Sequence, residues 1–285
     1  MKKFFIKKIV FIFLLFSFLI LSACDKHSDL ENIQFTDYID TYDLRIFAKE
    51  DVSSDFLNNV SKTYEEMFAD NAKIDQDMRS KYLSTSKNKY VYQRVGVEAS
   101  FENNENYAGG SPPAPYQDNA TDYIWEMQEG GKSQIGEVIE HLLHTVTNVI
   151  LHLAYIEDWD YMNSTSALSL ATQEAIDKGI YDVSSYEDIK KDDIEVYYKV
   201  ITQEYAYWLI LSEWDYYITA GKKREDISGN EEFKISSTTK LTLSEICLAF
   251  SIAFFDMSDP VASKPNFSNC IACVPGPVPR SKNFP

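Results

Sequence analysis

The sequence predicts an α+β fold in which a small N-terminal sheet with helices is followed by a mainly helical half. Segments rich in β-branched and aromatic residues occur early in the chain, whereas helical periodicity dominates later. Strands are expected at 42–48, 90–97 and 123–127. A loop rich in Asn, Gly and Pro occupies 102–119, and long ordered loops often border functional sites.

Helices are expected wherever apolar residues recur at helical spacing. A cap of Ser and Asp opens the first predicted helix, and Gly179 can end a later one in the left-handed conformation. The segment near the C-terminus is apolar on nearly all sides, which indicates burial. The predicted helices are 53–68, 74–83, one that begins near 133, 166–178, 193–219 and 243–255.

Residues 1–23 have the pattern of a bacterial lipoprotein signal peptide. A lysine-rich start precedes an apolar stretch, 9–21, that is short for a membrane span. Leu-Ser-Ala-Cys24 resembles the lipobox, after which the leader is cleaved and Cys24 is lipid-modified. Asp25 resembles an inner-membrane retention signal. We therefore expect an exported protein that is lipid-anchored to the bacterial cell envelope, with the membrane as its partner through Cys24.

The remaining chain is predicted to contain a tether (24–40), one folded domain (41–259) and a proline-rich C-terminal tail (260–285). The net charge is −17, and removal of a leader with four lysines and no acid makes it about −21. Such a charge argues against nucleic acid as a partner.

Three further cysteines, Cys247, Cys270 and Cys273, follow Cys24. Export permits disulfides, but three is an odd number and no second CxxC completes a zinc ribbon. The sequence leaves open whether one disulfide forms or none.

A seam of Glu and His side chains marks the helix predicted to begin near residue 133. At about 100° per residue, with Glu137 as zero, Glu140 lies at roughly −60°, His141 at +40° and His144 at −20°. Asn148 and His152 continue the seam, although His152 is too far along the axis to share an ion with His144. Two carboxylates and two imidazoles on one face are suitable ligands for zinc. The opposite face is apolar: Val138, Leu142, Val146, Val149 and Leu153.

A two-histidine site needs a further ligand from elsewhere in the chain, and Glu204 is the best candidate. Its neighbours in sequence are nearly all apolar or aromatic, so an unpaired carboxylate there would cost several kcal/mol. A bound cation would keep it charged, and so would hydrogen bonds from tyrosine hydroxyls. Glu213 and Asp215, further along, are poorer candidates.

These features together resemble the zincin metallopeptidases, and most closely the gluzincin branch. The resemblance covers 42–217: a short sheet, a Glu/His helix and a later helix with Glu204-Tyr-Ala. The family helix reads His-Glu-x-x-His, whereas this chain has Glu140-His141-Leu-Leu-His144, with the first two residues exchanged. In the inverted frame, His-x-x-Glu-His, Glu137 replaces the first His. The resemblance implies a zincin-like fold and a third zinc ligand on a second helix.

We therefore assign His141, His144 and Glu204 as zinc ligands, Glu137 as a possible additional ligand, and Glu140 as the general base. The expected activity is zinc-dependent hydrolysis of peptide-type bonds, with a peptide or protein as substrate. Tyr205 or Tyr207 could hydrogen-bond a developing oxyanion.

Two other interpretations of the seam remain open at this point. It could be the ordinary solvated face of an amphipathic helix, or a structural metal site without catalysis. The competing function class is a non-catalytic envelope lipoprotein that binds a partner or ligand through an acidic, aromatic-rich surface.

Overall fold

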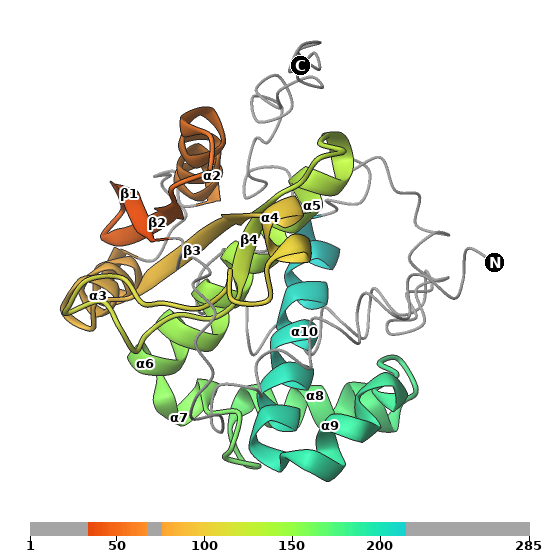
Figure 1. The fold of residues 1–285 in the computed structure, drawn as a ribbon. Coiled ribbons are helices and arrows are strands. Elements are labelled where there is room, and N and C mark those ends of the chain that lie inside the picture. The colour runs from red at the N-terminus through yellow and green to blue at the C-terminus, as the bar shows by residue number, and fades with distance from the viewer. Residues whose placement is uncertain (1–33, 68–75, 215–285) are drawn as a thin grey trace, which may run out of the picture.

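The predicted α+β class is confirmed by a computed structural model, which describes residues 34–67 and 76–214 (Figure 1). Several sequence predictions lie outside these residues: the leader with Cys24, the other three cysteines, the helix at 243–255 and the C-terminal tail. Within the described ranges, none of the helices has the length and apolarity needed to cross a bilayer.

A four-stranded mixed sheet forms the N-terminal part, with its strands in the order β1-β2-β3-β4. β1 and β2 form an antiparallel hairpin, and β3 and β4 add in parallel. Tyr42 and Asp43 both have positive φ, 43° and 59°, as expected for a tight two-residue hairpin turn. Most of β1 overlaps the predicted tether (24–40), so the folded part begins earlier than expected. The strands are β1 (Phe35–Thr41), β2 (Leu44–Lys49), β3 (Tyr92–Val97) and β4 (Tyr123–Glu126).

The remaining described chain is largely helical, as predicted. The Glu/His helix begins at 131 and passes at 145 into a seven-residue π-helix, η2, which the sequence did not predict. The last long helix is described as far as Trp214, so the predicted end at 219 lies outside. The helices are α2 (Ser54–Met67), α3 (Gln76–Asn88), α4 (Glu98–Asn103), α5 (Gly131–His144), η2 (Thr145–Leu151), α6 (His152–Ala154), α7 (Ile156–Trp159), α8 (Ala167–Asp177), η3 (Ser184–Tyr186), α9 (Glu187–Asp192) and α10 (Ile194–Trp214).

The main hydrophobic core lies between the sheet and the helices. One face of the sheet contributes Ile46, Val95 and Ile124, which pack in the same core as residues of α2, α5, η2 and α10. α5 and α10 lie side by side in Figure 1. Residues on α5 and α10 therefore come close together although about sixty positions separate them in sequence.

The other face of the sheet is covered by the 102–119 loop and α4. Tyr107, Tyr123 and Trp125 form a second core there, against which Phe101 packs. The buried Lys49 donates from Nζ to the carbonyl of Gly109, 2.7 Å away, and so fastens the loop to the sheet. The loop leads directly into Asp122 and β4, which places its end beside α5.

Candidate metal centre

The Glu/His seam of α5 divides into two pairs that have different partners. The first pair, Glu137 and His141, faces the outer edge of β4. Trp125 N donates to Glu137 Oε1 over 3.0 Å, and His141 Nδ1 is hydrogen-bonded to the Tyr123 carbonyl. In a strand, alternate residues present their backbone groups to the same edge. Glu137 and His141 therefore satisfy edge groups of β4 that no neighbouring strand pairs.

Gln134 extends this edge contact by one helical turn. Its Oε1 accepts from Met127 N at 2.7 Å, and its Nε2 donates to the Trp125 carbonyl at 2.8 Å. A side-chain amide thus takes the place of a fifth strand. The first seam pair consequently has a structural role in closing the sheet.

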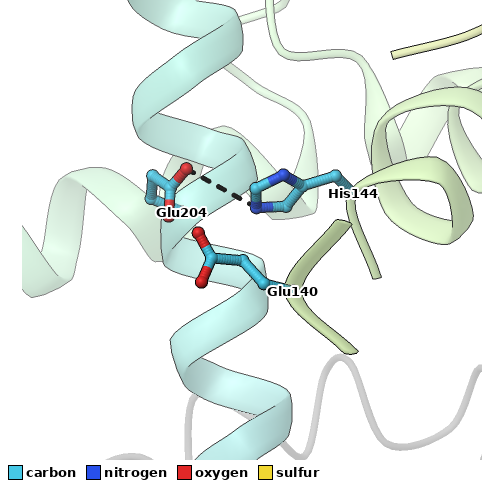
Figure 2. Close-up of side chains that lie close together, drawn as sticks. All are labelled: Glu140, His144 and Glu204. Atoms are coloured by element: carbon cyan, nitrogen blue, oxygen red, sulfur yellow. Dashed lines mark ion pairs between the residues drawn. The ribbon is translucent and has the colours of Figure 1, made fainter. Parts of the chain in front are cut away.

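The second pair, Glu140 and His144, faces α10. His144 Nε2 lies 3.5 Å from Glu204 Oε1, and one ligand atom each of Glu140, His144 and Glu204 lies within 4.8 Å of the others. Figure 2 shows the two carboxylates pointing toward the His144 ring from different helices. Glu204 therefore lies beside the seam although it comes from a distant segment of the chain.

His144 is hydrogen-bonded on one side of its ring, whereas on the other side it has the longer ion-pair contact with Glu204. Nδ1 lies 3.0 Å from Asp122 Oδ2. Nε2 is buried and has no hydrogen-bond partner within the described residues. A buried polar nitrogen without a hydrogen bond is costly, so its position among carboxylate oxygens favours a positive charge there, carried by a proton or a cation.

The carboxylates around His144 shift the pKa values of the groups in this site. Burial by itself would lower the pKa of His144, but the carboxylates of Glu204 and Asp122 outweigh it and raise that pKa to about 9. Burial would raise the pKa of Asp122, yet its hydrogen bond with His144 and the charge of that ring hold the pKa well below its usual range. A proton on His144 therefore supplies the positive charge when no cation is bound.

In the first pair, by contrast, both side chains favour their neutral forms. Burial, reinforced by the charge of Glu140, raises the pKa of Glu137 to about 8. Burial also lowers the pKa of His141 to about 3, so this imidazole is neutral near pH 7. Its Nε2 lies 4.0 Å from Glu140 Oε1.

The structure brings together three of the five residues assigned from the sequence, and it changes their grouping. Glu140, predicted as the base, lies in the possible ligand group, whereas His141, predicted as a ligand, lies outside it on the β4 side. Glu137 also faces β4, not Glu204. Tyr207 packs edge-on against the His144 ring, with 5.9 Å between the centroids.

The seam is not an ordinary solvated face. The His144 and Asn148 side chains are buried, at 1% and 5% exposure. His152 lies apart from the group, as predicted, with its ring stacked on Tyr161. The donor set of one imidazole and two carboxylates fits a divalent transition metal such as zinc, and Glu140, which is partly exposed, marks the side from which solvent reaches it.

Sequence reasoning missed two residues that contact His144. Asp122 directly precedes β4, and Gln203 directly precedes Glu204. The only available signals were their positions, at the end of a long loop and beside a candidate ligand.

Comparison with known proteins gives no further guidance. No family matches this sequence, and neither the curated proteins nor the solved structures contain a match.

Proposed function

We propose that this protein is a metallohydrolase that holds a zinc ion between α5 and α10 through Glu140, His144 and Glu204. The observation that carries the proposal is the position of the buried His144 Nε2, which faces the two carboxylates and has no hydrogen-bond partner among residues 34–67 and 76–214. Three protein ligands leave coordination positions for water and substrate, as in catalytic zinc sites. A divalent ion there would polarise a carbonyl group and acidify a water molecule.

The grouping supports the resemblance to gluzincins with two roles exchanged. In His-Glu-x-x-His, the ligands stand four residues apart, and the base follows the first ligand. Here Glu140 and His144 have the ligand spacing, Glu204 provides the third ligand from a later helix, and His141 has the position of the base.

The chemistry of His141 is compatible with that position. Its hydrogen bond to the Tyr123 carbonyl retains the proton on Nδ1, which leaves the lone pair on Nε2, the nitrogen nearer Glu140. A neutral imidazole in this orientation can accept a hydrogen bond from water and orient it for attack on a peptide-type carbonyl, but a pKa of about 3 makes the ring a weak base. We therefore propose that His141 orients the attacking water.

Metal analysis after zinc loading and dialysis tests the site. We expect about one zinc ion per wild-type chain, and at least tenfold weaker binding in His144→Ala and Glu204→Gln. His152→Ala is the matched control, because it removes a histidine from the same helical run outside the group. A wild-type protein that retains no zinc would refute the proposal.

Two variants distinguish whether Glu140 is a zinc ligand or the general base. If Glu140 is a ligand, Glu140→Gln weakens zinc binding, and His141→Gln retains zinc but loses peptide hydrolysis. If Glu140 is the base, as the sequence alone suggested, Glu140→Gln retains zinc and loses hydrolysis. Zinc binding without hydrolysis in the wild type, assayed on a fluorogenic peptide library, would indicate a structural metal.

The cellular location is a separate part of the proposal. The lipobox ending at Cys24 supports export and lipid anchoring. Labelling cells with radioactive palmitate should mark the wild-type protein and leave Cys24→Ala unlabelled. Equal labelling of the two would contradict the anchor.

A further inference from the structure

The Nδ1 side of His144 is enclosed by polar side chains from separate segments. Asp122 comes from the end of the loop before β4, Asn148 from η2 and Gln203 from α10. Gln203 Nε2 donates to Asp122 Oδ2 at 2.9 Å and lies 2.8 Å from His144 Nδ1. His144 Nδ1 itself lies 3.0 Å from the same Asp122 oxygen.

Donors around Gln203 fix the orientation of its amide. Its Oε1 accepts from Asn148 Nδ2 at 2.7 Å and from Thr121 Oγ1 at 3.4 Å. Exchanging the amide oxygen and nitrogen would oppose donor to donor, so Nε2 must face Asp122. Asp122 Oδ2 is therefore the common acceptor for Gln203 and His144.

An acceptor at this point determines where the imidazole proton lies. Two groups compete at Nδ1: the amide of Gln203 can only donate to it, over 2.8 Å, whereas the carboxylate of Asp122 accepts from Nδ1–H. The hydrogen bond to the charged carboxylate is the stronger of the two, so it keeps the proton on Nδ1. The neutral ring consequently has its lone pair on Nε2, the atom that faces Glu140 and Glu204. In metal sites, a carboxylate behind a histidine ligand orients the ring in this way and increases its basicity.

We propose that Asp122, held in place by Gln203, is a positioning residue that directs the lone pair of His144 into the cation site. This inference rests on the proposed function, because it concerns the orientation of one of its ligands. Asp122 lies at Nδ1, on the side of the ring away from the nitrogen that would bind the ion. It therefore acts on zinc affinity through His144. Loss of a carboxylate behind a histidine ligand usually weakens metal affinity about 10–100-fold.

Zinc titration of the full chain against a competing chelator tests this role. Asp122→Asn should weaken zinc affinity about 10–100-fold. Asp118→Asn is the matched control, because it makes the same charge change at an exposed residue of the same loop and should bind as the wild type does.

A second substitution tests whether a carboxylate beside His144 Nδ1 is what matters, by moving it from residue 122 to residue 203. Glu at 203 would place one oxygen where Nε2 now lies, 2.8 Å from Nδ1, and retain the other for Asn148. Asp122→Asn combined with Gln203→Glu should therefore regain most of the lost affinity. Failure of this rescue, or wild-type affinity in Asp122→Asn, would overturn the positioning role. A wild type without affinity for zinc would instead refute the proposed function.

The wild type provides an independent readout if Asp122→Asn does not fold. In zinc-loaded protein labelled with ¹⁵N-histidine, long-range ¹H–¹⁵N correlation should show the His144 proton on Nδ1 and the ion on Nε2. The reverse assignment would overturn the proposal.

Discussion

Without a bound cation, His144 should make the stability of the protein depend on pH. The folded pKa of about 9 exceeds the ordinary value of 6.5, so the folded state binds the extra proton between these values. The stabilisation is fully present below pH 6.5 and is lost as pH rises through 9. At about 1.36 kcal/mol per pH unit, the loss is up to about 3 kcal/mol.

Urea unfolding of chelator-treated wild type and His144→Gln, at intervals from pH 6 to 10, measures this loss. The wild-type advantage in unfolding free energy should decline by up to about 3 kcal/mol over the interval. Glu137 also titrates there, but its raised pKa stems from burial and Glu140, so it contributes equally to both proteins.

Zinc should reverse this loss of stability with rising pH, because the ion would bind His144 in place of the extra proton. Stabilisation by zinc at a concentration 100 times Kd is about 2.7 kcal/mol, and affinity should increase with pH up to about 9. An advantage of the wild type that stays constant or increases from pH 6.5 to 9 without metal would refute the electrostatic reasoning.

Three further substitutions test the sheet that supports the site. Gly96→Ala should destabilise the fold by about 1–3 kcal/mol in urea, because the added Cβ would lie 2.7 Å from the Trp125 ring; unchanged stability would contradict this packing. Gln134→Met should cost about 1–3 kcal/mol in the same assay, since it removes the partners of Met127 N and the Trp125 carbonyl, and a neutral effect would argue against edge closure. Burial lowers the pKa of Lys49 to about 8, so the stability of the wild type relative to Lys49→Met should increase from pH 8 toward 10.5; a difference that stays constant over this range would refute the assignment.

Much of the fold could be predicted from local patterns. The α+β class and helices such as 54–67 follow from apolar periodicity and capping residues, which act over a few positions. β1 was missed because it is a largely exposed edge strand with the polar sequence Phe-Thr-Asp-Tyr-Ile-Asp-Thr. The π-helix after His144 was missed because the sequence 145–151 has no local signal that distinguishes it from an α-helix.

The sequence by itself determined that a Glu/His seam lies on one helix and that Glu204 lies on another, because both statements depend only on helical spacing and neighbouring residue types. The side chains of the seam spread over only about 100°, so spacing could not decide which of them meets Glu204. The tertiary structure decided it: β4 occupies the side of Glu137 and His141, and α10 occupies the side of Glu140 and His144. Asp122 reaches His144 for the same reason, since only the packing of β4 against α5 places a loop residue behind that ring.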